Sequence, residues 1–243
     1  MGSTQTPEKI WLAEGAQKRA SVQTMFSQIA PSYDRVNGLV SLFSHRRWRA
    51  AAARALRLKP GDRALDACCG TGDFLLPLRL AVTESGRVVG FDFCAPMLDR
   101  AVTKPRHGAS LALADACAIP FRSSTFDSVS VGWGIRNVPD VDLAHREAFR
   151  VLRPGGRFVS VDMARAKFGP VRWISDQVFN RLVPLIGGLF GNRQAYTYLP
   201  ESTARFMTRE ELTQSMRSAG FIDVTTRDFM FGNICMHLGR KPE

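Results

Sequence analysis

The stretch Leu65-Asp66-Ala67-Cys68-Cys69-Gly70-Thr71-Gly72-Asp73, LDACCGTGD in one-letter code, contains two glycines but has Leu75 where a third would complete a dinucleotide fingerprint. A dinucleotide site uses that third glycine for close helix packing and rests a pyrophosphate on the helix N-terminus. Here Asp66 and Asp73 place carboxylates beside the loop, and carboxylates repel phosphate and attract cations. The stretch therefore favours a nucleoside cofactor that carries a cationic amino acid, and S-adenosylmethionine has that composition.

Strand and helix patterns alternate on both sides of this stretch. Strand patterns cover 63–67, 87–91, 110–113, 128–131 and 157–162, and helical patterns cover 74–80, 95–102 and 141–152. Thr208 and Glu211 then form a capping box, and 221–227 and 234–238 alternate like a closing hairpin. Alternating strands and helices indicate a mostly parallel sheet with helices on both faces. We predict a Rossmann-like α/β fold built on seven strands.

The segments outside the strand series define the domain organisation. A chain of 243 residues suits one domain with additions, which we place at 21–243. Residues 1–20 are polar and aperiodic, which predicts a flexible tail. Residues 21–58 show helical spacing, broken at Pro31, and predict a helical cap. Residues 165–205 predict a helical insertion or lid, because their apolar stretch at 171–190 is interrupted by Pro184 and a glycine pair.

Acidic residues follow the second and third predicted strands. Asp92 ends the second strand about 20 positions beyond the glycines, where an acidic residue hydrogen-bonds a ribose diol. Asp115 follows the third strand, where it could accept the adenine amine while Ala116 leaves room for the ring. Each acid alone could instead cap the next helix. Together, in order along one βαβ series, they favour a methyltransferase.

The net charge and the cysteine content indicate which classes of binding partner and which cellular compartment to expect. The 33 basic and 22 acidic residues give a net charge of +11, which favours anionic partners. The segment 45–49, HRRWR, could touch acidic lipid, or it could be a solvated helix face. A membrane contact is preferred over nucleic acid, because the chain shows no aromatic-rich RNA platform. The five cysteines lack metal-ligand spacing, so we expect no metal site. No secretory leader precedes the domain, and we expect a cytoplasmic protein, peripheral on the inner face of the membrane.

Eight segments of the chain resemble the ubiquinone/menaquinone biosynthesis C-methyltransferases, which methylate a ring carbon of a polyprenylated quinol. The segments are MFSQIAPSYDRVNGLVSLFSHRRWR (25–49), LDACCGTGD (65–73), VVGFDF (88–93), DACAIPF (115–121), FDSVSVGWGIRNVPD (126–140), FRVLRPGGRF (149–158), YTYLPEST (196–203) and HLGRK (237–241). The resemblance implies S-adenosylmethionine as cofactor and a lipophilic quinol as substrate. It implies cofactor contacts at Thr71, Asp92, Phe93, Asp115, Ala116 and Gly132, beside the loop glycines Gly70 and Gly72.

The candidates for holding or deprotonating a quinol hydroxyl are Tyr33, Arg136 and Asn137. Arg136 and Asn137 leave the fourth predicted strand at the edge where ligands meet an α/β sheet, and an arginine there can stabilise a developing phenolate. They could instead pin the loop before Pro139. His45 could serve as a base, but we favour a polar helix face for it.

Three functions stay open: a quinol C-methyltransferase, a methyltransferase of another small lipophilic acceptor, and a basic nucleic-acid-binding protein with a vestigial cofactor site. The retained acidic residues at the strand ends count against the third. The quinol ring, naphthoquinol or benzoquinol, and the assembly, including a homodimer, also stay open.

Overall fold

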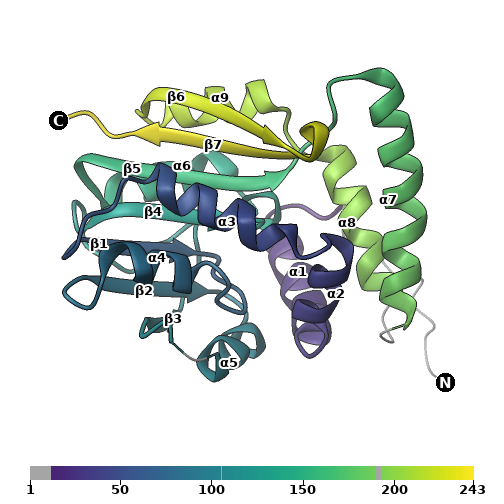
Figure 1. The fold of residues 1–243 in the computed structure, drawn as a ribbon, viewed down its shortest axis with the longest axis horizontal. Helices are drawn as coiled ribbons and strands as arrows, with labels where there is room; N and C mark the ends of the chain where they lie inside the picture. The colour runs from purple at the N-terminus through teal and green to yellow at the C-terminus, as the bar shows by residue number, and fades with distance from the viewer. Residues whose placement is uncertain (1–11, 105, 190–192) are drawn as a thin grey trace.

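The computed structural model describes residues 12–104, 106–189 and 193–243, and its strands form one sheet in the order β3-β2-β1-β4-β5-β7-β6 (Figure 1). The strands are β1 Arg63–Ala67, β2 Arg87–Asp92, β3 Ser110–Leu113, β4 Phe126–Gly132, β5 Leu152–Met163, β6 Ile222–Phe229 and β7 Ile234–Arg240. Strands β1 to β5 pair in parallel, and β7 runs antiparallel between β5 and β6. The predicted seven-stranded Rossmann-like sheet is confirmed.

Helices lie on both faces of the sheet and at the edge to which the parallel strands point (Figure 1). The α-helices are α1 Gly15–Ile29, α2 Tyr33–Val40, α3 Ser44–Ala55, α4 Leu75–Val82, α5 Ala95–Thr103, α6 Val141–Val151, α7 Gly169–Leu189, α8 Arg193–Arg205 and α9 Arg209–Ser218, with short 3-10 turns η2 Ile135–Asn137 and η3 Met230–Gly232. In Figure 1, α1, α2, α7 and α8 gather at that carboxyl edge. Within the described ranges, no helix has the length and apolarity to cross a membrane.

The alternation of side chains along each strand builds a core on each face of the sheet. In β5, Phe158 packs with Leu212 and Met216 of α9 in one core. The next residue, Val159, packs with Leu75 of α4 in the other core. Successive side chains of a strand point to opposite faces, so both faces of the central strands are buried.

A third core joins the N-terminal helices to the 165–205 segment. Its buried members come from α1, α2, α7, α8 and the start of α5, namely Val22, Met25, Ile29, Ala30, Val36, Cys94, Met97, Val183, Ala195, Tyr196 and Tyr198. A Cβ added at Gly187 would lie 2.5 Å from the Tyr196 Cβ, so a glycine is required where α7 meets α8. The helices at the carboxyl edge therefore form one packed unit above the strand ends.

Three element boundaries differ from the sequence predictions. Helix α1 begins at Gly15, within the predicted tail. Its Lys18 Nζ donates to the Val138 carbonyl at 2.7 Å, and a long-range contact of this kind has no signature in the local sequence pattern. Helix α7 continues through Pro184 without interruption, since both Val183 and Pro184 are buried there. Strand β5 begins at Leu152, so the predicted Pro-Gly-Gly turn forms part of the strand. Its pairing with β4 shifts register between Phe126 and Ser128. Residues 1–11 of the predicted tail lie outside the described residues.

Candidate cofactor and substrate sites

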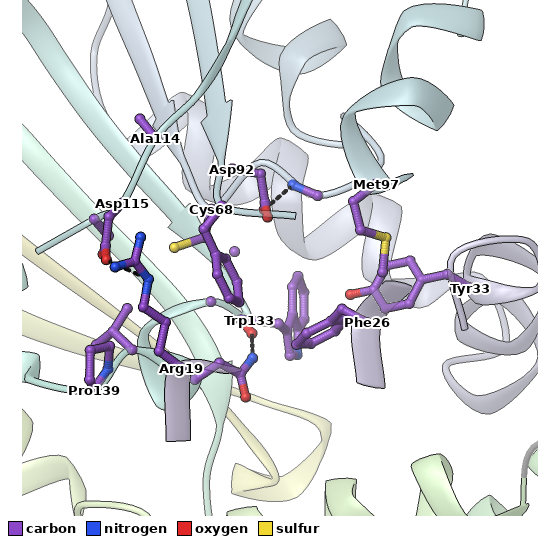
Figure 2. Close-up of a pocket in the computed structure, with 17 residues that line it drawn as sticks. Arg19, Phe26, Tyr33, Cys68, Asp92, Met97, Ala114, Asp115, Trp133 and Pro139 are labelled. Atoms are coloured by element: carbon purple, nitrogen blue, oxygen red, sulfur yellow. Dashed lines mark hydrogen bonds and ion pairs between the residues drawn. The ribbon is translucent and has the colours of Figure 1, made fainter. Parts of the chain in front are cut away.

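A narrow pocket lies where β1, β2 and β4 end, and α1 and α2 cover it (Figure 2). Most of the predicted cofactor residues line it together: Gly70, Asp92, Phe93, Asp115, Ala116 and Gly132. The helical cap contributes Phe26 and Tyr33, whose rings meet edge to face with centroids 6.1 Å apart. Figure 2 shows these two rings beside Trp133, opposite the strand-end carboxylates.

Asp92 is buried and oriented by two backbone donors. Its Oδ2 accepts from the Gly70 N–H at 2.8 Å and its Oδ1 from the Cys94 N–H at 2.9 Å. Burial raises the pKa of Asp92 to about 6, against the lowering effect of these backbone hydrogen bonds. At neutral pH the side chain is therefore a fixed carboxylate that can accept hydrogen bonds from a diol.

Asp115 and Ala116 lie at the other end of the same pocket. The Asp115 Oδ1 accepts from the Cys117 N–H at 2.9 Å, and its Oδ2 pairs with Arg19 Nε of α1 at 3.1 Å. Figure 2 shows the Arg19 side chain reaching this carboxylate. Sequence reasoning missed Arg19, because nothing in the local pattern of α1 indicates a partner so distant in the chain.

Thr71 and Gly72 do not line the pocket. The Thr71 hydroxyl donates to Asp34 Oδ1 at 2.6 Å and accepts from Lys104 Nζ at 3.0 Å, so it is committed to partners behind the loop. Gly72 has φ +83, and a Cβ there would lie 3.1 Å from the Ala101 Cβ. In the structure these two residues hold the loop, and their predicted contact with the cofactor stays a prediction.

Asp66 of β1 and Asp73 of the loop that follows have different surroundings. Burial raises the pKa of Asp73, but Arg49 and Lys104 outweigh it and leave the pKa below the ordinary value. Asp66 accepts from the Ser130 hydroxyl at 2.6 Å through Oδ1, while its buried Oδ2 has no partner among the described residues. Burial raises the pKa of Asp66 to about 7. Only Asp66 thus retains an oxygen for a cationic group, and this unpaired oxygen fits the amino-acid end of the predicted cofactor.

A second, larger cavity of about 390 Å³ adjoins the pocket. It lies among α1, α2, α3, α7 and α8, and its walls include Met25, Ile29, Val40, Phe179 and Leu182. Phe26, Tyr33 and Trp133 line both spaces and form the boundary between them. A mostly apolar cavity of this size can bury a ring with part of a hydrocarbon tail.

Two residues of the HRRWR segment in α3, His45 and Arg49, are buried. His45 is buried, its Nδ1 lies 2.5 Å from the Ser41 hydroxyl, and burial lowers its pKa to about 4. Arg49 is also buried, and its guanidinium lies 4.5 Å from the centre of the Trp133 ring. Both line the larger cavity, so the assignment of His45 to a polar helix face is wrong. Arg46 and Arg47 are exposed as a solvated face requires.

Arg136 lines the larger cavity from η2, immediately after β4. Its guanidinium pairs with Asp162 and its Nε donates to the Ser202 hydroxyl at 3.1 Å. Burial raises the pKa of Asp162, against the opposing effect of Arg136. Sequence reasoning missed Asp162, although it ends a parallel strand as Asp92 does and the same signal could have found it.

Asn137 and Tyr33 lie on the cofactor side of Arg136. Asn137 Nδ2 donates to the Trp133 carbonyl at 3.1 Å, and its Oδ1 accepts from the Tyr198 hydroxyl at 2.9 Å. Burial raises the pKa of Tyr33, although Arg49 acts in the opposite direction, so the phenol stays protonated at neutral pH. Tyr33 lines both spaces, while Asn137 lines the cofactor pocket and Arg136 the larger cavity.

The sequence matches the model of the ubiE/COQ5 methyltransferase family over residues 14–241. The chain belongs to this family. Among its relatives, the demethylmenaquinone methyltransferase of Lactiplantibacillus plantarum is 38% identical over 227 residues, which are 91% of this chain and 96% of that one. The demethylmenaquinone methyltransferase of Staphylococcus aureus is 36% identical over 233 residues, covering 95% and 97%.

Solved structures share the fold of this methyltransferase. An S-adenosylmethionine-dependent methyltransferase of Thermotoga maritima aligns with a TM-score of 0.65 at 22% identity, covering 90% of this chain and 99% of that one. The phosphoethanolamine N-methyltransferase 2 of Haemonchus contortus, solved in complex with S-adenosyl-L-methionine, aligns with a TM-score of 0.57 at 18% identity, covering 81% and 53%.

Proposed function

We propose that this methyltransferase transfers a methyl group from S-adenosylmethionine to a ring carbon of a polyprenylated quinol, with demethylmenaquinol as the acceptor. The observation that carries the proposal is the boundary formed by Phe26, Tyr33 and Trp133, across which the cofactor pocket adjoins a large apolar cavity. An acceptor ring at this boundary would lie next to the cofactor while its tail occupies the cavity. The naphthoquinol is favoured over the benzoquinol by the names of the curated relatives.

Two carboxylates of the pocket, Asp92 and Asp115, match polar groups of the methyl donor, S-adenosylmethionine. Asp92 would accept from the ribose hydroxyls, and Asp115 from the adenine amine with Ala116 against the ring. Asp66 does not line the pocket, but it lies in β1 just before Cys68 and Gly70, which do, and its buried, unpaired Oδ2 would accept from the amino group of the methionine end. When bound, the cofactor supplies an electrophilic methyl group on its sulfonium.

The larger cavity has polar side chains, among them Arg136 and Tyr33, that suit the ionisation of a quinol. A ring hydroxyl that loses its proton to solvent raises the electron density at the adjacent carbon. This carbon would form the bond to the methyl group while the methyl–sulfonium bond breaks and S-adenosylhomocysteine leaves. The ring C–H proton then leaves to solvent and restores aromaticity. Arg136 would stabilise the phenolate as a fixed cation, since preorganised charge in a site with little water is the largest common source of rate enhancement. Tyr33 and Asn137 would orient the ring, and positioning alone lowers the barrier further.

The test must separate the charge of Arg136 from its part in the fold. Removing Arg136 alone would leave the buried Asp162 carboxylate unpaired, which destabilises proteins by about 3–5 kcal/mol. In the double substitution Arg136→Gln with Asp162→Asn, both charges are removed and a neutral pair remains. We expect methyl transfer to fall on the order of a hundredfold, with cofactor affinity nearly unchanged by calorimetry. The single variant Arg136→Lys, which keeps a cation beside Asp162, serves as the matched control.

The assay uses labelled S-adenosylmethionine and a short-tailed demethylmenaquinol kept reduced by dithionite. The oxidised quinone has no phenolic proton to lose, so it should not react. Equal rates on quinol and quinone, or full turnover by the double variant, would show that phenolate stabilisation by Arg136 is wrong. Turnover of other lipophilic phenols at the same rate would instead point to a different acceptor.

A further inference from the structure

Helix α7 carries a stripe of exposed apolar side chains. Ile174, Val178, Leu182, Leu185 and Leu189 are 56%, 51%, 44%, 60% and 79% exposed. At 3.6 residues per turn, these positions fall within an arc of about 80°. Five large apolar side chains exposed on one face of one helix form a patch of the kind that marks an interaction site. We call these five residues the α7 stripe.

The α7 stripe is separate from the packed face of the same helix and continuous with the larger cavity. Val183 and Gly187 are buried and belong to the side that meets α8. Ile174, Val178 and Leu182 line the cavity and are still partly exposed, so the stripe runs from the cavity wall onto the outer surface. Figure 1 shows α7 at the outer edge of the molecule, on the side of the carboxyl ends of the parallel strands.

A second apolar element lies beside one end of the α7 stripe. Met230 and Phe231 of η3 are 51% and 81% exposed, and Met230 lines the larger cavity. The hydrogen bond from Asn233 Nδ2 to the Ser175 hydroxyl, at 2.9 Å, holds this turn against α7. Trp173, next to the stripe, is 67% exposed, and tryptophan is enriched at membrane–water interfaces.

Cationic side chains accompany this apolar surface. Arg181 of α7 is exposed, whereas the exposed Arg172 lies 3.9 Å from the Asp176 carboxylate of the same helix, and the chain carries a net charge of +11. An apolar helix face flanked by arginine is the pattern of helices that lie in the interface of anionic bilayers. Basic side chains near such a surface add attraction to anionic headgroups.

We propose that the α7 stripe, with Met230 and Phe231, docks on an anionic lipid bilayer and turns the mouth of the larger cavity toward the membrane. The inference rests on the proposed function in one respect: a polyprenylated acceptor partitions into lipid, and a cavity that opens onto the bilayer receives it without passage through water. The docking surface itself is defined by exposure, charge and continuity with the cavity.

The experiment measures co-sedimentation of the full chain with vesicles. Wild-type protein should bind phosphatidylglycerol-containing vesicles and bind pure phosphatidylcholine vesicles more weakly, and added salt should weaken the first binding. The double variant Leu185→Gln with Leu189→Gln should bind about tenfold more weakly, because two apolar groups are withdrawn from the lipid. Neither residue lines the cavity. The matched control is Leu80→Gln with Val102→Gln, at exposed positions of α4 and α5 that are 72% and 69% accessible.

Each outcome decides the proposal. Equal vesicle binding by the stripe variant and the wild type, or equal loss in the control variant, would overturn it. Light scattering that shows a wild-type dimer and a monomeric stripe variant would assign the stripe to a second copy of the chain and would also overturn it. Because vesicle binding is measured without turnover, failure to methylate a short-tailed demethylmenaquinol would count against the proposed function and leave the docking result intact.

Discussion

Asp66 carries a structural cost that its proposed contact with the cofactor would explain. Its folded pKa of about 7 lies above the value of about 3.9 for an unfolded aspartate. A group with a raised folded pKa contributes its full stability below its unfolded pKa and loses that contribution as the pH rises through the folded pKa. The ionised Asp66 therefore destabilises the cofactor-free protein at neutral pH. A buried acid kept at such a cost is typical of functional sites.

Replacing Asp66 by asparagine tests this cost directly. Asp66→Asn keeps an acceptor for the Ser130 hydroxyl and removes the charge. We expect the variant to be more stable than the wild type at pH 8, by on the order of 1–4 kcal/mol, and the difference to shrink between about pH 7 and pH 4. Urea unfolding across this pH range, without cofactor, measures it. Cofactor affinity should fall in the same variant, because its amide cannot replace the carboxylate as a partner for an ammonium group.

A stability difference that does not change with pH would contradict the assignment of the raised pKa to Asp66. Asp127→Asn provides the matched control, because Asp127 is a less buried aspartate that already pairs with Arg153 at 2.9 Å. It should not reproduce the pH dependence of the Asp66 variant.

The residues that the sequence could predict at the site are those whose position follows from the fold. Asp92 and Asp115 come directly after parallel strands, so their place at the carboxyl edge follows from the strand pattern alone. His45 and Arg49 lie on a helix with arginines on two sides, and which face of that helix is buried depends on how it packs over the strand ends. Local sequence contains no measure of that packing.

At the level of elements, α1 places Arg19 at the end of the pocket where Asp115 lies. Its Arg19 pairs with Asp115, and the Arg19 side chain is 53% exposed. An exposed ion pair contributes at most about 1 kcal/mol. If Asp115 accepts the adenine amine, the cofactor must displace Arg19 from the carboxylate. The arginine therefore competes with the ligand.

Arg19→Ala should accordingly tighten the binding of S-adenosylhomocysteine by up to about fivefold, the equivalent of about 1 kcal/mol. Calorimetry measures the affinity, and Arg217→Ala, at an exposed arginine of α9, gives the background effect of removing one positive charge. Weaker binding in the Arg19 variant would show that Arg19 contacts the cofactor instead of competing with it.

Element boundaries show what local pattern can and cannot specify. The strands were predictable because buried parallel strands are short apolar runs bounded by turn residues. Helix α9 was predictable because Thr208 and Glu211 form the capping box that the sequence indicates. The uninterrupted α7 was not, since a proline is disfavoured in a helix interior, and Pro184 lies buried within this helix near Gly187, which contacts Tyr196 of α8.

For the molecule as a whole, the cofactor pocket lies between separate cores. Phe26 and Tyr33 pack against the core shared by α1, α2, α7 and α8, whereas Cys68 and Ala116 belong with the core of the sheet. All four residues line the pocket. A ligand in the pocket therefore contacts two units that otherwise meet through a limited set of side chains, among them Cys94 and Met97 at the start of α5. Bound ligand should stabilise the helical unit against local opening more than it stabilises the sheet.

Hydrogen exchange with and without saturating S-adenosylhomocysteine tests this expectation. We expect amides of α1 and α2 to exchange at least about tenfold more slowly with ligand, because local opening of these helices breaks the contacts of Phe26 and Tyr33 with it. Amides of β4 and β5 open only with the whole domain and should change less under conditions where global unfolding is rare. Asp92→Ala, with weakened cofactor binding, should lose the protection of α1 and α2. Equal slowing in every element would indicate that the ligand stabilises one cooperative unit, and slowing confined to the loop at 68–72 would indicate that the helices make no contact with it.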